Sequence, residues 1–213
     1  TSSFPFGTGK HLTLQNVLIW FQRLSYVGEL GWELYIPTQH AKTIYHLLME
    51  SGKSHNFIHA GAHAMDIMRL EKMYLHWGHD ISPEENPYEA RLGFAVRLNK
   101  EEDFIGKKAL LQIHNKIPKK QLIMLTLNNS EPGNPLLLHD EPIYCNGQIV
   151  GETTSGQFSF NFNKNMSLGY INLPESKEEL QNNKFQIEVA KKKYDATLQL
   201  TALHDHKNIL IKK

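Results

Sequence analysis

The residues best suited to chemistry in this chain gather around one short turn. Residues 23–34 (RLSYVGELGWEL) hold two glycines, two acids and two aromatic residues between apolar runs. A β-hairpin needs only the turn, so Tyr26, Glu29, Trp32 and Glu33 exceed what folding requires. A carboxylate accepts hydrogen bonds from adjacent N–H donors, and an aromatic ring stacks on a flat molecule. The pattern therefore predicts a pocket wall for a flat heteroaromatic ligand.

Alternation along the expected return strand separates Glu33 from its neighbours. If Trp32 and Leu34 face the core, Glu33 points to the other face of the sheet. A solvent-exposed strand glutamate and a sheet-edge tyrosine are the ordinary explanations of Glu33 and Tyr26. A ligand contact is the alternative for both, and the residues alone leave the choice open.

The elements that must position this turn form a mixed pattern over the first half of the chain. Strands are expected at residues 17–25, 32–36 and 91–98. Helices are expected at residues 38–52 with Thr38 as N-cap, 59–77 and 104–112. Residues 1–10 have the composition of a linker. Strands and helices in this order indicate an α+β fold.

Beyond residue 120 the pattern becomes almost purely β. Six short strands are expected, at residues 121–127, 142–145, 148–153, 167–171, 184–189 and 194–200. Asn146-Gly147 is a strong hairpin turn signal between two of them. Six such strands predict a small closed antiparallel barrel or a jelly roll. We therefore expect two domains, at residues 1–115 and 120–213.

Composition narrows the classes of function. The 213 residues carry a formal charge of +1 with histidine neutral, which gives no indication of a nucleic-acid or membrane-surface partner. No apolar run approaches the roughly 20 residues of a membrane-spanning helix. A single cysteine, Cys145, excludes an internal disulfide and favours a reducing compartment such as the cytoplasm.

Histidines and one helical charge cluster are further candidates for a site. Five histidines lie within residues 55–79, but their spacing matches no metal-binding motif, so we expect no metal. Arg69, Glu71 and Lys72 fit either an internal ion network or a clamp on an anionic ligand. The ion network is the simpler interpretation, because helix charges usually do little else.

Five short motifs, in this order, resemble those of the glycine cleavage T-protein (aminomethyltransferase) superfamily. They lie at residues 26–33 (YVGELGWE), 64–72 (AMDIMRLEK), 86–90 (NPYEA), 103–107 (DFIGK) and 151–156 (GETTSG). The resemblance is strongest to the branch fused to dimethylglycine and sarcosine dehydrogenases. It implies a partial folate-binding α/β domain followed by a C-terminal antiparallel β-barrel. The implied activity is transfer of a one-carbon unit from an aminomethyl or methylated-amine donor to tetrahydrofolate.

The resemblance also implies three residues that bind tetrahydrofolate. Tyr26 matches the tyrosine of the Y-[TV]-G-E-x-G pattern, which lies at the folate. Glu33 matches the acid that holds the pterin edge, and Phe94 matches an aromatic position that lines the pterin site. The aspartate that handles protons in the family precedes the matched tyrosine, and this chain has no aspartate before Asp66. No catalytic residue is therefore assigned.

That missing aspartate implies that an N-terminal half of the family's domain is absent from this chain. The implied partners are that half or a fused flavin dehydrogenase domain, which would carry the FAD. In a eukaryote the resemblance implies the mitochondrial matrix. The chain alone is expected to be inactive.

Three positions depart from the family pattern. Met65 and His63 stand where arginines occur, and Arg91 stands where most members have glycine. Arg69 or Arg91 would have to replace an anion-binding arginine. Three functions stay open: a one-carbon transfer module, a non-catalytic regulatory module that retains the fold, and a structural module that docks on a flavin domain. The non-catalytic module stays open because the superfamily that the chain resembles includes a phosphatase regulatory subunit, in which the fold persists without transfer chemistry.

Overall fold

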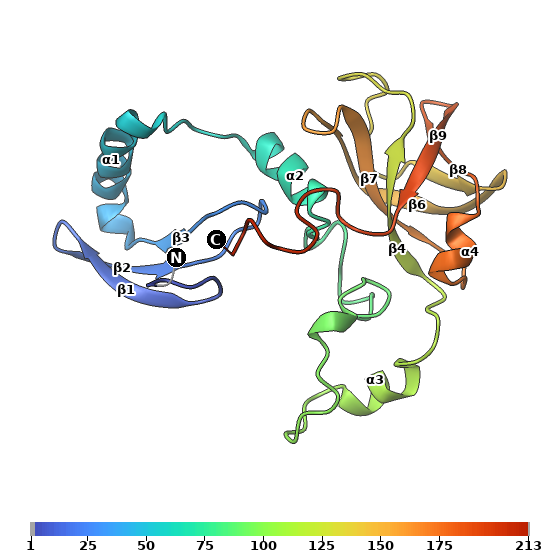
Figure 1. Ribbon diagram of the computed structural model, residues 1–213, viewed down its shortest axis with the longest axis horizontal. Coiled ribbons are helices and arrows are strands. Elements are labelled where there is room, and N and C mark those ends of the chain that lie inside the picture. Colours follow the sequence, from blue (N-terminus) through green and yellow to red (C-terminus); the bar gives the residue numbers. More distant parts are fainter. Residues whose placement is uncertain (1–2, 213) are drawn as a thin grey trace. The chain divides into compact units, whose positions relative to one another are not determined.

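The computed structural model describes residues 3–212, which divide into two compact units (Figure 1). The first unit combines Thr1–Lys72 with His204–Lys213, and the second consists of Met73–Leu203. The expected domains at residues 1–115 and 120–213 were drawn from the family resemblance, whereas the two units are defined by how compactly the chain packs. The domain division therefore stays a prediction. The mixture of helices and strands agrees with the α+β prediction.

The first unit is built on a three-stranded antiparallel sheet in the order β1-β2-β3. Its strands are β1 (Gly9–Leu14), β2 (Val17–Gln22) and β3 (Glu33–Tyr35). Helix α1 (Ala41–Gly52) covers one face, where its Ile44 joins the buried cluster of Val17 and Ile19. On the other face Leu18 and Tyr35 remain 60% and 55% exposed. The unit is therefore two layers deep, with one open sheet face.

Several local expectations for this unit were wrong. Residues 9 and 10, which were expected to belong to a linker, begin strand β1, because Gln15 and Asn16 adopt positive φ angles (45° and 64°) and turn the chain back into β2. A 3₁₀ turn at Thr38–His40 precedes α1, and no side chain caps it, so the Thr38 N-cap was wrong. Helix α2 spans Ala62–Glu71 and is shorter than predicted.

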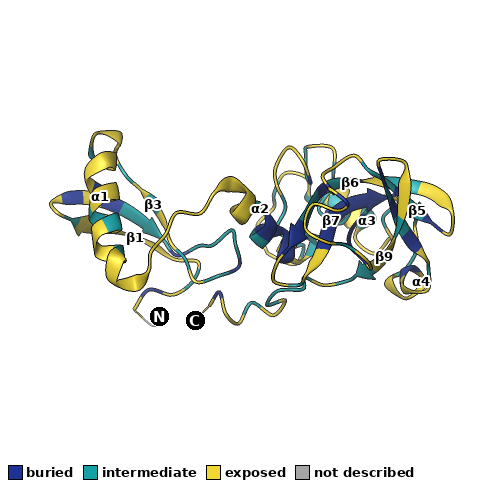
Figure 2. Ribbon diagram, turned by 90° about the horizontal axis from the view of Figure 1, so that it is seen from above, coloured by how far each residue is buried: buried dark blue, intermediate teal, exposed yellow. Residues whose placement is uncertain are grey.

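The second unit contains a closed antiparallel barrel in the order β4-β7-β6-β5-β8-β9, which confirms the barrel prediction. Its strands are β4 (Gln121–Leu127), β5 (Pro142–Cys145), β6 (Gln148–Ser159), β7 (Lys164–Ile171), β8 (Phe185–Val189) and β9 (Lys192–Gln199). Asn146 and Gly147 make the predicted turn with positive φ angles of 49° and 86°. Figure 2 shows β7 largely buried, whereas α1 of the first unit is largely exposed.

Strands β4 and β7 are buried on both faces, unlike an ordinary barrel strand. Their inward side chains, such as Leu125 and Ile171, belong to the apolar core of the barrel. Their outward side is covered by the chain that precedes the barrel: Leu122 N donates to Glu89 O (2.9 Å), and the Tyr170 hydroxyl donates to Asp80 O (2.8 Å). Burial on both faces explains why residues 122–127 form a continuous apolar run interrupted only by a threonine.

Residues 91–98 do not form the predicted strand. Arg91 has a φ of 58°, and a 3₁₀ helix follows at Gly93–Ala95. A strand needs a neighbouring strand for its backbone hydrogen bonds, and this segment instead closes local turns, with Ala95 N donating to Leu92 O. Two short helices, α3 (Lys107–Ile113) and α4 (Lys177–Gln181), complete the unit.

Candidate functional site

Tyr26 and Glu33 lie close in sequence at the connection between β2 and β3 of the first unit. Tyr26 is half-buried in the connecting loop, and Glu33 is exposed at the start of β3. Leu34 packs against the buried cluster on the α1 side of the sheet, so Glu33 points to the other face, as the alternation predicted. Trp32 precedes the strand and does not join that cluster. The Tyr35 hydroxyl donates to Glu33 Oε2 at 3.0 Å. The open face thus presents a carboxylate beside a phenol.

Aromatic rings extend along the same open face. Trp20 in β2 pairs directly with Tyr35 in β3. A Cβ added at Gly9 would lie 2.2 Å from Trp20 Cζ2, so the indole ring lies across that glycine. The His11 ring packs edge-on against Trp20, with 4.9 Å between ring centroids. This arrangement can receive a planar ligand whose N–H donors face the carboxylate of Glu33.

Trp32, which the sequence singled out, has a structural partner. Arg23 is fully buried, and its guanidinium carbon lies 4.7 Å from the centroid of the Trp32 ring. Arg23 Nη1 also donates to Phe4 O (3.2 Å), and the Phe4 ring meets Trp32 edge-on. A cation against an aromatic face stabilises both groups when solvent is excluded. Trp32 therefore covers a buried charge at the base of the loop.

The glycine of the turn allows a buried lysine to pass. Gly28 has a φ of 77°, and a Cβ there would come 2.3 Å from Lys72 Cγ. Lys72 Nζ donates to Asp205 O (2.7 Å) and Asn208 Oδ1 (2.8 Å). Glu29 Oε1 pairs with His204 Nε2 at 2.7 Å. Lys72 Nζ also lies 3.6 Å from Asp205 Oδ2, so Lys72 takes part in an internal ion pair that holds the C-terminal segment, in agreement with the simpler interpretation of this residue.

The two arginines considered as anion-binding replacements contact groups of their own units. Arg69 is buried, and its Nε and Nη2 atoms each lie 2.7 Å from Asp66 Oδ1. Arg91 Nη2 donates to Leu200 O (3.0 Å), and burial lowers the pKa of its guanidinium. The positive φ of Arg91 accounts for the glycine expected there, because glycine adopts that conformation without strain. These contacts explain both arginines without a ligand.

Phe94 lies in the second unit, apart from the unit that holds Tyr26 and Glu33. Its side chain is 80% exposed within the 3₁₀ helix Gly93–Ala95. An aromatic ring this exposed contributes little to the core and is available for stacking. The three predicted contacts are therefore divided between the units, and only Tyr26 and Glu33 share one.

Asp80 is a polar centre that the sequence did not indicate. It is buried in the second unit, where its Oδ1 accepts hydrogen bonds from Thr154 Oγ1 (2.5 Å) and Ser155 Oγ (2.8 Å). Its Oδ2 accepts from His76 N at 2.9 Å. Burial raises the pKa of nearby Tyr170, which keeps the hydroxyl that donates to Asp80 O protonated. No local pattern signals these contacts, because the partners are 74 and 75 residues away.

The motif at residues 151–156 is accounted for by these barrel contacts. A Cβ at Gly151 would come 1.8 Å from Tyr170 O, and one at Gly156 would come 2.5 Å from Leu138 O. The β6–β7 register shifts between Thr153 and Ser155, which allows Thr154 and Ser155 to reach the same aspartate. The two glycines and the two hydroxyls therefore serve packing of the barrel rather than a ligand.

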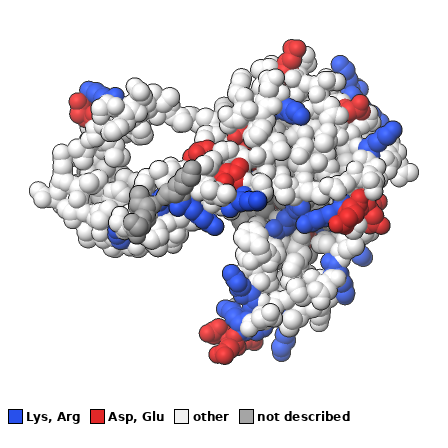
Figure 3. All heavy atoms as spheres, in the orientation of Figure 1, with Lys and Arg blue, Asp and Glu red and all other residues white. Residues whose placement is uncertain are grey.

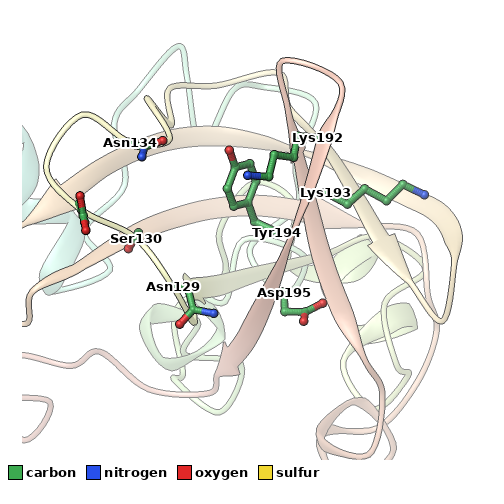
Figure 4. A pocket seen from close by; sticks show the side chains of 8 residues that line it. Asn129, Ser130, Asn134, Lys192, Lys193, Tyr194 and Asp195 are labelled. Atoms are coloured by element: carbon green, nitrogen blue, oxygen red, sulfur yellow. The ribbon is translucent and has the colours of Figure 1, made fainter.

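The barrel unit also has surface cavities. One of about 390 Å³ lies between the loop after β4 and the β8–β9 hairpin (Figure 4). Its lining comprises Asn129, Ser130, Glu131, Asn134, Lys192, Lys193, Tyr194 and Asp195. Lys193 Nζ lies 3.5 Å from the centroid of the Tyr144 ring and Lys192 Nζ 5.0 Å from that of Tyr194. Both lysines thus pack on aromatic rings beside acidic side chains.

A second cavity, of about 370 Å³, lies beside β6 and β7 of the barrel. Its lining includes His79, Glu85, Lys120, His139, Glu152 and Tyr170. Lys120 Nζ lies 2.5 Å from Glu85 Oε1 and 4.5 Å from the centroid of the Tyr170 ring. The cation that contacts the Tyr170 ring in this cavity is therefore Lys120, a side chain of the protein, and not a ligand.

The charges on the visible face and the possible metal ligands among residues 3–212 indicate no further site. In Figure 3 the basic side chains on the visible face are scattered and interspersed with acidic ones, without a continuous basic surface. Among residues 3–212, no group of three His, Cys, Asp or Glu is arranged to hold a metal ion. Within the same residues no helix is long and apolar enough to cross a membrane.

Two protein-family models match the chain in succession. The GCVT N-terminal domain matches residues 1–100, and the glycine cleavage T-protein C-terminal barrel domain matches residues 120–205. The chain is 37% identical to the mitochondrial dimethylglycine dehydrogenase of Homo sapiens over 92% of its own length and 22% of that protein. It is 35% identical to an aminomethyltransferase of Symbiobacterium thermophilum over 78% of its length and 44% of that protein.

Solved structures give the same fold. An aminomethyltransferase T from Bartonella henselae superposes with a TM-score of 0.80 at 24% identity. The match covers 97% of this chain and 54% of that one. The chain thus spans about half of this structural relative and about a fifth of the dehydrogenase, which bounds what can be carried from whole proteins to this chain.

Proposed function

This chain belongs to the glycine cleavage T-protein family, and from that we propose that it binds tetrahydrofolate as a module for one-carbon transfer. The donor would be an aminomethyl group or a methylated amine. One observation carries the proposal: Glu33, at the motif position of the pterin-binding acid, is exposed beside Tyr35 and Trp20 on an open sheet face. Folding of the unit does not require a carboxylate there.

The residues of the first unit fit the chemistry of a pterin ring. The pyrimidine edge of a pterin presents adjacent N–H donors, and a carboxylate offers about four lone-pair positions to accept them. Tyr35 uses one of these positions, which leaves both oxygens able to accept. Tyr26, half-buried in the neighbouring loop, would contact the ring. Phe94 remains a folate contact that is expected from the family motif alone.

Tetrahydrofolate, when bound, supplies the amine nitrogens that receive the one-carbon unit. The part played by this chain would be to hold the pterin edge at Glu33, orient the ring and exclude water from it. No residue of this chain is assigned as a proton carrier. The proposal therefore concerns binding and positioning, which raise the effective concentration of the reacting groups.

A larger protein is part of the same proposal. Similarity to two families of larger enzymes supports a partner, either a further half of the folate domain or a flavin dehydrogenase domain that carries FAD. The family matches at residues 1–100 and 120–205 support the proposed domains at 1–115 and 120–213. Mitochondrial relatives support the matrix as the location in a eukaryote.

Calorimetric titration of tetrahydrofolate into the intact protein and its Glu33 variants tests the binding site. We expect Glu33→Gln to weaken binding about tenfold or more, since it removes the charge and one acceptor, a loss of about 1.4 kcal/mol or more. Glu50→Gln is the matched control, because Glu50 is an exposed acid on α1 that pairs with its neighbour Lys53. Wild-type affinity in Glu33→Ala would reject the contact, and no heat at millimolar tetrahydrofolate would reject folate binding.

A non-catalytic module is the second candidate, and the arginines favour it. Met65 replaces the arginine of the family motif, and Arg69 pairs with Asp66. An anion-binding arginine is thus not supplied where the family has one. Assay of methylene transfer by the intact protein distinguishes the two candidates: transfer at an enzymatic rate excludes this one, whereas folate binding without transfer supports it.

A further inference from the structure

The Tyr35 hydroxyl and the Glu33 carboxylate are joined on the open face of the first unit's sheet. Tyr35 Oη lies 3.0 Å from Glu33 Oε2, and their two-residue spacing places both on one face of β3. Tyr35 is 55% exposed and Glu33 is exposed as well, so neither fills the core. An exposed polar contact of this kind adds little to stability. The contact does, however, influence the direction in which the Glu33 carboxylate points.

The strand that carries Tyr35 is paired with a strand whose Trp20 is held in place by β1. Trp20 is the cross-strand partner of Tyr35, and side chains so paired lie about 4.5–5.5 Å apart at Cβ. Trp20 itself lies across Gly9 and contacts the edge of His11. The pairing of β3 with β2, Trp20 with Tyr35 and Gln22 with Glu33, fixes the backbone from which the phenol reaches Glu33.

We propose that Tyr35 is a positioning residue that orients the Glu33 carboxylate for a planar ligand with adjacent N–H donors. This inference rests on the function proposed above. The hydroxyl occupies one lone-pair position and restricts rotation of the carboxylate, which leaves both oxygens open to two parallel N–H groups. A carboxylate ordered before binding loses less conformational entropy when the ligand arrives, so its affinity is higher.

The protonation state of Tyr35 is compatible with this role. Its hydrogen bond to Glu33, together with the negative charge of that group, raises the pKa of the phenol above its ordinary value. The hydroxyl therefore keeps its proton at neutral pH and remains a donor. Substitution by phenylalanine removes this donor and leaves the ring in place.

Tetrahydrofolate affinity and transfer kinetics of the intact protein test the proposal. We expect Tyr35→Phe to weaken binding about three- to tenfold and to raise KM with little change in kcat, because the contact is the same in substrate and transition state. The loss should disappear in the Glu33→Gln background, since no charged carboxylate remains to be oriented. Tyr45→Phe is the matched control: its exposed hydroxyl also meets a side chain, His59, at 2.9 Å, and it should change nothing.

Each other result rejects a different statement. Wild-type affinity in Tyr35→Phe together with weak binding in Glu33→Gln overturns the role of Tyr35 and leaves the folate site standing. An equal loss in both backgrounds shows that Tyr35 acts on the ligand directly, which also overturns positioning. If the wild-type protein binds no tetrahydrofolate, the proposed function fails. Ultraviolet titration of Tyr35 then tests the contact between Tyr35 and Glu33 by itself. An unchanged tyrosine pKa in Glu33→Gln overturns the contact, and a lowered pKa supports it.

Discussion

The open sheet of the first unit and the barrel of the second place their polar side chains differently. Glu33 and Tyr35 lie exposed on the sheet and hydrogen-bond to each other. In the barrel unit Asp80, Thr153 and Ser155 are buried, and each has partners from distant segments. A three-stranded sheet with a helix on one side leaves its second face uncovered, whereas a closed barrel has an interior and, here, a covered outer wall.

This difference in burial distinguishes two glycine-rich motifs that look similar in the sequence. Residues 151–156 are explained by contacts within the barrel, because their glycines admit neighbouring backbone and their hydroxyls bind Asp80. In residues 26–33, Gly28 and Glu29 are explained in the same way by Lys72 and His204. Glu33 is not, which makes it the better candidate for a ligand contact.

The largest expected effect is at the barrel glycine Gly151. We expect Gly151→Ala to lower the free energy of unfolding by about 3 kcal/mol or more, because the new Cβ meets the Tyr170 carbonyl at 1.8 Å and backbone must move. Thermal or urea unfolding measures this. Gly61→Ala in the first unit is the control: no atom lies within 4 Å of the added Cβ, so its effect should stay within about 0.5 kcal/mol. Equal stabilities for the two variants would contradict the packing argument.

A somewhat smaller loss is expected when the buried carboxylate of the barrel unit is removed. Asp80→Ala leaves Thr154, Ser155 and the His76 N–H without their acceptor, which costs about 2–4 kcal/mol of unfolding free energy. The same unfolding measurement with Asp195→Ala, an exposed acid bound by Gln186, should show little change. If Asp80→Ala is as stable as wild type, the hydrogen bonds that Asp80 accepts do not stabilise the second unit.

The smallest predicted effect concerns pH and the C-terminal segment of the first unit. Burial of Asp205 alone would raise its pKa, but the N–H groups of Ile209, Ile211 and Leu210 and the charge of Lys72 lower it below the ordinary 3.8. A lowered folded pKa means that the stabilisation is complete above about pH 3.8 and is lost as the pH falls through the folded value. Hydrogen exchange of residues 204–211 should therefore accelerate, relative to its intrinsic rate, only below pH 3.8. Asp205→Asn should remove this dependence, and a transition near neutral pH would contradict it.

Local patterns predicted the barrel better than the first unit. The expected bounds of β4 and β5 match the structure, because the apolar run of β4 and the Asn146-Gly147 turn after β5 are properties of neighbouring residues. Strand β1 was missed, since its six residues are mostly exposed and lack an apolar alternation. Residues 91–98 have strand composition but adopt turns, which shows that propensity without a pairing partner is insufficient.

The candidate site divides in the same manner. The order of motifs indicated the family, and the alternation in β3 placed Glu33 on the face opposite Leu34. The roles of Trp32 and Glu29 could not be predicted, because Trp32 covers Arg23 and Glu29 pairs with a residue near the far end of the chain. Tyr35 and Glu33 are two residues apart, so their contact is local. Whether the two side chains are exposed depends on which face of the sheet α1 covers, and local sequence does not determine this.

The sequence by itself determined the family, the barrel and its Asn146-Gly147 turn, because each follows from residue types a few positions apart. Only the tertiary structure decided which polar groups are used in folding. Lys72 meets Asp205 across 133 residues, Arg91 meets Leu200 across 109, and Asp80 meets Thr154 across 74. Burying a polar group is favourable only where a partner is brought to it, and chain folding alone brings such partners together.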